Sequence, residues 1–244
     1  MPNLLVLQNS ANLDTSVSRR LVATFVEAYV QRHPDAEIVH RDLARNPLPH
    51  LSPSLAAALL PGQGAATPDI GLADILTAEL EAADIIVIGA PFYNFAIPST
   101  LKAWLDHVVR VGRTFAYVNG APQGLLPPGK KVIAFVASGG AYAEGPASAM
   151  DFASPYLRFI FGFMGVTDVE IVRAEWQAVP VRGAISAQAA ADRALNLAAQ
   201  IGTVIPADQQ PDEAVPRHSG LAVRATSDQI ESADRIKLLA KTKS

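Results

Sequence analysis

The chain contains no cysteine, and this absence limits the chemistry open to it. Without cysteine there can be no disulfide, no thiolate nucleophile and no cysteine-ligated zinc or iron–sulfur centre. The five histidines show no i, i+4 spacing of the kind that metal sites use, so we assign no metal. Any redox chemistry must therefore come from a bound cofactor.

Long apolar runs and basic stripes are also missing. The first apolar run, 4–7, is far shorter than a signal-peptide core, and no later run reaches the length that spans a bilayer. The net charge is −3 and the Lys and Arg residues are scattered, a pattern that argues against nucleic acid as a partner. We expect a cytoplasmic protein that binds neither membranes nor nucleic acid.

The composition is that of a packed α/β protein. Of 244 residues, 50% are hydrophobic and only 18% are charged, as in a globular domain. From Pro206 onward the sequence shifts to Pro, Gln, Asp and Ser. We therefore expect one domain over 1–205 and a mobile C-terminal tail over 206–244.

Short apolar runs alternate with longer amphipathic stretches, which predicts a parallel sheet covered by helices on both faces. The predicted strands are 3–8, 36–41, 84–90, 131–138 and 167–174. The predicted helices are 16–31, 70–82, 100–111, 149–164 and 184–205, with a long crossover at 46–68 that holds at most a short helix at 53–60. This order indicates a doubly wound five-stranded sheet, either flavodoxin-like or a truncated Rossmann type.

Ligands of such sheets bind beyond the carboxyl ends of the strands, which directs attention to three loops. The first, Ser10 to Ser18, places Ser10, Ser16 and Ser18 where a strand turns into a helix. Hydroxyls at that junction can cap the helix or hold a phosphate at its N-terminus. The loop has neither Gly-x-x-x-x-Gly-Lys nor Gly-x-Gly-x-x-Gly, which disfavours ATP and Rossmann-style NAD binding.

The second loop, Pro91 to Pro98, carries Phe92, Tyr93, Asn94 and Phe95 directly after a buried strand. Aromatic side chains exposed at a turn need something to cover them. A flat conjugated ring fits, because aromatics pack its faces while Asn94 and the backbone amides hydrogen-bond its polar edge. The alternative is that these side chains fill a core or a subunit interface.

The third loop follows the fourth predicted strand and contains Ser138, Gly139, Gly140 and Tyr142. Paired glycines allow close approach of the backbone to a ligand. Their N–H groups could hold a carbonyl or a developing negative charge, although a plain turn also explains them.

On these residues the chain resembles the FMN-dependent NADH-azoreductase family, flavodoxin-fold NAD(P)H:quinone oxidoreductases that act as homodimers. The most specific part is Pro91-x-Tyr93-Asn94-Phe95-x-Ile97-Pro98, followed by Leu101, Lys102 and Asp106. Thr114-Phe115-x-Tyr117, Gly139-Gly140, Gly145-Pro146 and the run from Pro155 to Asp168 support it. The resemblance covers residues 3–205 and therefore excludes the tail.

The resemblance implies FMN as cofactor, NADH or NADPH as electron donor, and a homodimer with FMN at its interface. It implies that Ser10, Ser16 and Ser18 hold the phosphate and that Phe92, Tyr93, Asn94 and Phe95 line the ribityl chain and the ring. Ser138, Gly139, Gly140 and Tyr142 would complete the flavin site, and Tyr117 would form a wall of the substrate pocket.

The third loop departs from the family pattern. The family often has Ser-Arg-Gly-Gly and a nearby His, whereas this chain has Ala137-Ser138-Gly139-Gly140 and Tyr142. A phenol donates a hydrogen bond but does not titrate near neutral pH. We expect two-electron hydride transfer to quinones or azo compounds in two half-reactions, with Tyr142 or solvent as proton source. The alternatives are an electron carrier resembling flavodoxin and a non-catalytic regulator that uses the tail.

Overall fold

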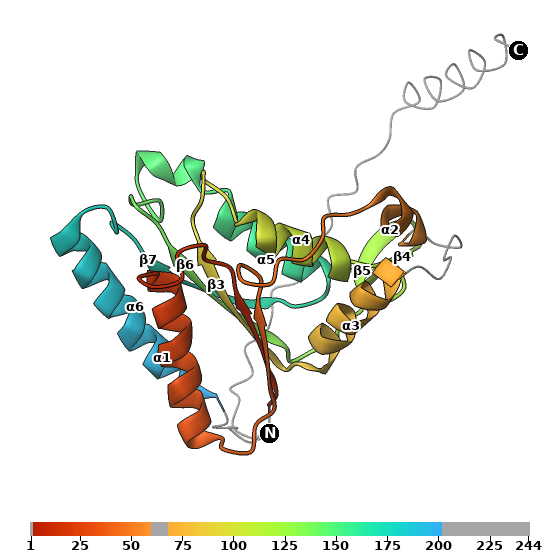
Figure 1. Ribbon diagram of the computed structural model, residues 1–244, viewed down its shortest axis with the longest axis horizontal. Coiled ribbons are helices and arrows are strands. Elements are labelled where there is room, and N and C mark those ends of the chain that lie inside the picture. The colour runs from red at the N-terminus through yellow and green to blue at the C-terminus, as the bar shows by residue number, and fades with distance from the viewer. Residues whose placement is uncertain (1, 60–67, 202–244) are drawn as a thin grey trace, which may run out of the picture. The chain divides into compact units, whose positions relative to one another are not determined.

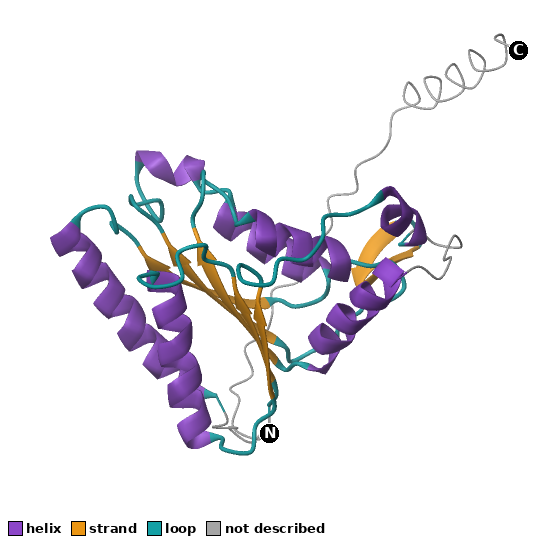
Figure 2. Cartoon of the chain, in the orientation of Figure 1, coloured by secondary structure: helices purple, strands orange, loops and turns teal. Residues whose placement is uncertain are grey.

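The computed structural model describes residues 2–59 and 68–201, so the predicted tail over 206–244 lies outside the described residues. The main sheet contains β1 Leu4–Gln8, β2 Ile38–Asp42, β3 Ile85–Pro91, β6 Lys131–Ala137 and β7 Asp168–Ala174. A separate hairpin is formed by β4 Phe115–Val118 and β5 Ala121–Gly124 (Figure 2). The helices are α1 Val17–Arg32, α2 Pro53–Ala58, α3 Pro68–Ala82, α4 Ser99–Val108, α5 Ala153–Phe163 and α6 Pro180–Gln200, with a 3-10 helix η1 at Pro146–Met150.

The main sheet is parallel throughout, with strand order β2-β1-β3-β6-β7. This is the flavodoxin-like order, and it confirms the predicted flavodoxin-like fold. The central strand β3 is buried along its whole length, which is why its sequence is a continuous apolar run rather than an alternating one.

Helices α1 and α6 cover one face of the sheet, and α3, α4 and α5 cover the other (Figure 1). Because successive strand residues point to opposite faces, each strand supplies both layers of the core. Leu5 and Leu7 pack into the cluster that contains Trp104, whereas Leu4 and Val6 pack into the cluster that contains Phe135. Within the described residues, no helix is both long enough and apolar enough to cross a membrane.

The hairpin β4–β5 was not predicted, because its strands are short and one contains Pro122. It is held by tertiary contact with the end of α5. Leu126 N–H donates to the Met164 carbonyl at 3.0 Å, and a Cβ on Gly124 would lie 2.2 Å from the Gly165 nitrogen. Glycine is therefore the residue that lets the hairpin approach this closely.

Several predicted helix boundaries were wrong for local reasons. The single helix expected over 149–164 is η1 followed by α5, because Asp151 Oδ1 accepts hydrogen bonds from the Ala153 and Ser154 N–H groups, both at 3.0 Å, and caps α5. Helix α6 begins at Pro180 rather than at 184, since proline suits the first helical position. Helix α4 ends at Val108 rather than at 111, where Val109 becomes extended.

Two Gly→Ala substitutions should change stability in opposite directions. Gly124→Ala places a methyl group against backbone atoms of Gly165 and should lower the free energy of unfolding by about 1–3 kcal/mol. Gly71→Ala, in α3 with nothing within 4 Å of the added Cβ, should raise it by about 0.5–1 kcal/mol. Urea unfolding of both variants measures this, and equal midpoints would contradict the close packing at Gly124.

Candidate functional site

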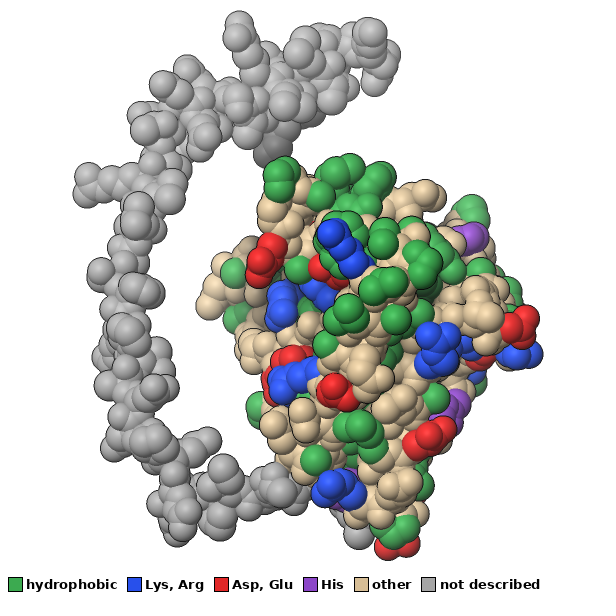
Figure 3. All heavy atoms as spheres, turned by 90° about the vertical axis from the view of Figure 1, so that its left-hand side faces the viewer, with side chains coloured by type: hydrophobic (Ala, Val, Ile, Leu, Met, Phe, Trp, Pro, Cys, Tyr) green, Lys and Arg blue, Asp and Glu red, His purple; other side chains and the backbone are tan. Residues whose placement is uncertain are grey.

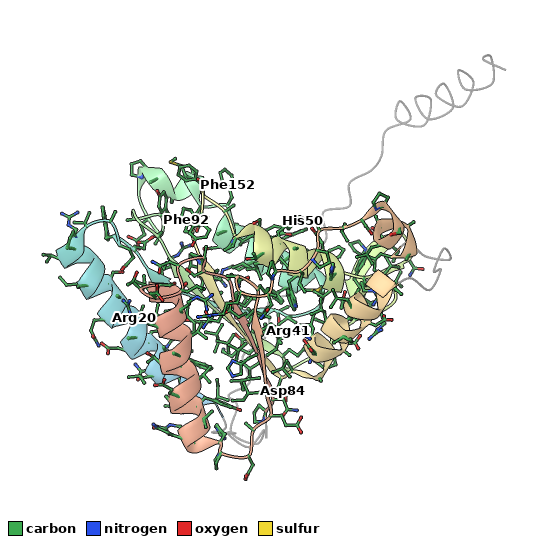
Figure 4. All side chains as sticks on the ribbon, in the orientation of Figure 1. Arg20, Arg41, His50, Asp84, Phe92 and Phe152 are labelled. Atoms are coloured by element: carbon green, nitrogen blue, oxygen red, sulfur yellow. The ribbon has the colours of Figure 1, made fainter. Side chains whose placement is uncertain are left out.

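The three loops expected to bind a ligand meet at one end of the sheet. Phe92 and Phe152 lie at the carboxyl end of the strands, whereas Asp84 lies at the opposite end (Figure 4). The Ser10 hydroxyl is 3.5 Å from the Tyr93 hydroxyl, which joins the first loop to the second. The rings of Phe92 and Tyr142 have centroids 4.6 Å apart, which joins the second loop to the third. The three loops are thus neighbours in space.

The serine loop both caps α1 and leaves donors free. Ser16 is the N-cap, and its hydroxyl accepts a hydrogen bond from the Arg19 N–H at 3.4 Å. The Ser16 and Ser18 hydroxyls are 3.1 Å apart, with Ser18 fully buried at 0% exposure behind Ser16. The N–H groups of Ser16 and Val17 donate to no acceptor in the described part of the chain. The helix therefore presents a positive N-terminal end.

Arg19 fixes the direction of this loop, a role that sequence reasoning missed. Its Nε and Nη2 donate to the Ser10 carbonyl at 3.1 and 2.8 Å. The same guanidinium forms a two-pronged ion pair with Asp42 at the end of β2, with both distances 2.8 Å. The hydrogen bond from Arg19 lowers the pKa of Asp42 below its usual value. The carboxylate thus holds Arg19, and Arg19 holds Ser10.

Asn9 is a second residue that sequence reasoning missed. It is buried, and its Nδ2 donates to the Gly89 carbonyl of β3 at 3.0 Å. Its Oδ1 accepts a hydrogen bond from the Thr100 hydroxyl at 3.4 Å. An Asn that directly follows an apolar strand was the available signal. It ties the end of β1 to β3 and to the start of α4.

The second loop is a tight turn in a strained conformation. The N–H of Tyr93 donates to the Ala96 carbonyl at 3.2 Å, and the N–H of Ala96 donates to the Tyr93 carbonyl at 3.0 Å. The two central residues, Asn94 and Phe95, have φ of 48° and 70°, as in a type I′ turn. A bulky residue at positive φ is costly, and such strain concentrates at functional sites. The N–H groups of both central residues donate to no acceptor among the described residues.

Aromatic rings gather beside this turn. Phe92, Phe95 and Tyr142 contact one another, with Phe95 edge-on to Phe92 at 6.2 Å and to Tyr142 at 6.0 Å. The Tyr142 ring also lies against the backbone of the third loop, since a Cβ on Gly140 would approach it to 3.3 Å. In that loop the Ser138 hydroxyl donates to the Gly140 carbonyl at 2.8 Å. Within the described chain the N–H groups of Gly139 and Gly140 find no acceptor.

A cavity of about 1140 Å³ opens beside the second loop. Its walls are mostly apolar and aromatic, and they include Tyr93, Asn94, Ile97, Phe152, Tyr156 and Phe159. Two charged residues, Lys102 and Asp151, also line it. Hydrophobic side chains are also visible on the surface at this end of the molecule (Figure 3). A mostly apolar cavity with a few polar groups is typical of sites for planar organic ligands.

Tyr117 does not join the other predicted residues. It lies on the β4–β5 hairpin, where its ring is 65% exposed and packs edge-on against Phe115 at 5.8 Å. It does not line the cavity beside the second loop. Its place in a substrate pocket stays a prediction. Across residues 2–59 and 68–201, no group of three or more His, Asp or Glu side chains could hold a metal ion.

Comparison with known proteins places this geometry in a family. Residues 2–198 match the family model described as flavodoxin-like fold. The chain is 45% identical over 200 residues to the FMN-dependent NADH:quinone oxidoreductase of Herminiimonas arsenicoxydans, covering 80% of this chain and 98% of the relative. It is 48% identical over 179 residues to the FMN-dependent NADH:quinone oxidoreductase 2 of Pseudomonas fluorescens, covering 72% and 88%. The chain belongs to the FMN-dependent NADH:quinone oxidoreductase family.

Solved structures agree with this membership, and they confirm the resemblance drawn from the aromatic segment. The azoreductase from Bacillus anthracis strain Sterne superposes with a TM-score of 0.74 at 29% identity, covering 81% of this chain and 99% of that one. An FMN-dependent NADH-azoreductase from Bacillus anthracis strain Ames Ancestor, solved in complex with FMN, has a TM-score of 0.73 at 26% identity, covering 81% and 98%.

The ion pair of Arg19 with Asp42 should appear in the pH dependence of stability. Because the folded state lowers the pKa of Asp42, this carboxylate stabilises the fold above its unfolded pKa of about 4, and the contribution is lost as pH falls through the folded value. Asp42→Asn should lower the free energy of unfolding by about 1 kcal/mol at pH 7 and by progressively less below about pH 4.

Urea unfolding between pH 3 and pH 7 measures this difference. Asp14→Asn, which alters an exposed carboxylate of the serine loop, is the control and should leave stability unchanged at every pH. A constant gap between wild type and Asp42→Asn across the range would contradict the assignment.

Proposed function

We propose that this chain is an FMN-dependent NAD(P)H oxidoreductase that reduces quinones and azo compounds. The observation that carries the proposal is the set of N–H groups without acceptors in the described chain, presented by three loops that adjoin at the carboxyl end of the sheet, with an apolar cavity beside the second loop. A cofactor with a phosphate at one end and a flat ring with polar edges at the other fits these donors. Membership of the family supports the same cofactor and donor.

The serine loop fits the phosphate end of FMN. The N–H groups of Ser16 and Val17 and the hydroxyls of Ser10 and Ser16 would hold it, helped by the positive end of α1. Ser18, which is fully buried, would contribute by orienting the Ser16 hydroxyl 3.1 Å away. Arg19 keeps the loop in shape through the Ser10 carbonyl.

The other two loops fit the ring end. Phe92, Tyr93 and Phe95 offer aromatic surface, and the backbone at Asn94 offers donors. The N–H groups of Gly139 and Gly140 offer donors from the opposite loop, with Ser138 holding that loop in shape. When bound, FMN supplies the two-electron chemistry between the nicotinamide donor and the acceptor.

The chain's own residues orient the reactants and exclude water. The cavity beside Tyr93 receives the nicotinamide and then the acceptor in turn, which corresponds to a ping-pong order. The Tyr142 hydroxyl or solvent supplies the proton that the product needs. An open cavity of this size favours an enzyme over an electron carrier, which needs no small-molecule site. Because nicotinamide donors are cytoplasmic metabolites, we place the reaction in the cytoplasm.

We further propose a homodimer, because an aromatic surface runs from the hairpin along α5. Four aromatic rings form a continuous row of contacts. The ring centroids are 5.8 Å apart for Tyr117 and Phe115, 4.5 Å for Phe115 and Phe163, and 6.2 Å for Phe163 and Phe159. Tyr117, Phe159 and the neighbouring Phe152 are 65, 66 and 64% exposed. Large apolar side chains exposed together mark an interaction surface. A second copy would cover Phe152 and Phe159 at the cavity and would bring a Tyr117 toward it.

Anaerobic absorbance spectroscopy tests the function directly. The protein reconstituted with FMN should be yellow, NADH or NADPH should bleach the flavin band, and a quinone or azo dye should restore it. Stopped-flow traces with each nicotinamide give the donor preference. A chain that takes up no FMN contradicts the cofactor, and bound FMN that neither nicotinamide reduces favours the electron carrier.

Two serine variants provide the matched control for the site. Ser16→Ala should weaken FMN binding about tenfold, as expected for loss of one hydrogen bond to a charged group. Ser52 caps α2 as Ser16 caps α1, accepting from the Leu55 N–H at 3.1 Å, but it lies in a different loop. Ser52→Ala should leave FMN affinity unchanged. Equal losses in the two variants would show that the Ser16 effect is one of helix capping alone.

Introducing a charge into the aromatic surface should break the dimer. Phe159→Asp should give a monomer in sedimentation velocity and reduce quinone turnover by more than about tenfold, because a buried unpaired charge costs several kcal/mol at an interface. Leu195→Asp, at a position 46% exposed on α6 across the sheet, should change neither property. A Phe159→Asp variant that stays dimeric would exclude this surface as the interface.

A further inference from the structure

The segment between β7 and α6, residues 175–178, holds the third loop from behind. We call this segment the β7 clamp. Three successive backbone N–H groups of the clamp donate to carbonyls of that loop: Trp176 to Gly140 at 3.2 Å, Gln177 to Ser138 at 2.9 Å and Ala178 to Gly139 at 3.1 Å. Every carbonyl from 138 to 140 therefore points toward the clamp.

This arrangement decides where the N–H groups of the loop point. In a planar trans peptide unit the C=O and the N–H lie on opposite sides. With the carbonyls of Ser138 and Gly139 turned to the clamp, the N–H groups of Gly139 and Gly140 must turn away from it. These N–H groups donate to nothing in the described residues. The clamp thus creates the free donors at the candidate flavin site.

The clamp achieves this through backbone strain. In an extended strand successive N–H groups alternate in direction, so three in a row cannot reach the same neighbour. Trp176 breaks the alternation with φ of 62°, an unfavourable value for a bulky residue. Gly183 makes room for it, because a Cβ there would lie 2.7 Å from the Trp176 carbonyl oxygen. The side chain of Gln177 then ties the clamp to α6, because its Nε2 donates to the Gly183 carbonyl at 3.0 Å.

Glu175 anchors the far end of the same loop. Its Oε1 accepts hydrogen bonds from the N–H groups of Tyr142 at 2.6 Å and Ala143 at 2.7 Å. Its own N–H donates to the Ser186 hydroxyl of α6 at 2.8 Å. One carboxylate oxygen thereby holds the backbone that carries the Tyr142 ring against Gly140 and Phe92.

We propose that Glu175 is a positioning residue of the flavin site, which acts by holding the Tyr142 end of the third loop so that the clamp keeps the Gly139 and Gly140 N–H groups turned outward. The inference rests on the proposed function, in which these groups face FMN. Reduced flavin carries negative charge on its N1 and O2 edge, and correctly aimed donors stabilise that charge. Glu175 would therefore set the affinity for FMN and the balance between its reduced and oxidised forms.

A set of substitutions at Glu175 separates the position of the acceptor from its charge. Glu175→Gln keeps the acceptor and removes the charge, Glu175→Ala removes both, and Glu175→Asp keeps the charge but shortens the reach. Glu175→Ala should bind FMN about tenfold more weakly than Glu175→Gln and have a lower midpoint potential, because only Ala removes the acceptor that holds the Tyr142 end of the loop. Glu175→Asp should bind FMN more weakly than wild type and should also have a lower midpoint potential.

Fluorescence titration of FMN and spectroelectrochemistry of the bound flavin give the two readouts. Glu144→Ala, which removes an exposed carboxylate from the same loop, should match wild type in both. The positioning role is excluded, while the proposed function stands, if two midpoint potentials agree: that of Glu175→Ala with Glu175→Gln, and that of Glu175→Asp with wild type. If Glu175→Ala does not fold, the comparison of Asp with wild type still decides. A wild-type chain that binds no FMN overturns both proposals together.

Discussion

The parallel pairing of β1 with β3, from Leu4 opposite Ile85 to Gln8 opposite Gly89, is the contact on which the site depends. The chain leaves β1 toward one face of the sheet, into α1, and leaves β3 toward the other, into α4 (Figure 1). A crevice must therefore open where these two connections diverge. Asn9 closes its floor by bonding the Gly89 carbonyl. The polar groups of the three loops lie above this pair, whose strands are mostly apolar.

The fold could be predicted from sequence where burial is continuous. β1, β3 and β6 are apolar along most of their length, and such runs between helical stretches specify a parallel sheet with little ambiguity. The hairpin could not be predicted, because Phe115–Val118 and Ala121–Gly124 have no strong strand pattern of their own. Its position depends on the contact of Gly124 with Gly165, which no local pattern reveals. The starts of α5 and α6 likewise depend on single residues: Asp151 bonds the first N–H groups of α5, and Pro180 suits the first position of α6.

The candidate site was predictable in its local parts only. The aromatic turn stands out because Phe92, Tyr93 and Phe95 are unusual after a buried strand. The residues that hold the loops in place do not stand out. Arg19 meets Asp42 across 23 positions of sequence, and Tyr142 meets Glu175 across 33. Arg, Asp and Glu are common on any surface, so their partners become known only from the three-dimensional structure.

Two bulky residues have positive φ: Phe95 in the second loop and Trp176 in the clamp that bonds the third loop. Each of these backbone conformations lowers the free energy of unfolding. Free N–H groups add a second cost wherever water reaches them poorly. Natural sequences retain such costs where the strained state performs a task, since glycine at either position would relieve the strain. At Phe95 the strain exposes two donors and an aromatic ring together, and at Trp176 it turns the carbonyls of a neighbouring loop. In both places the backbone is held ready for a ligand, so binding need not supply the free energy to rearrange it.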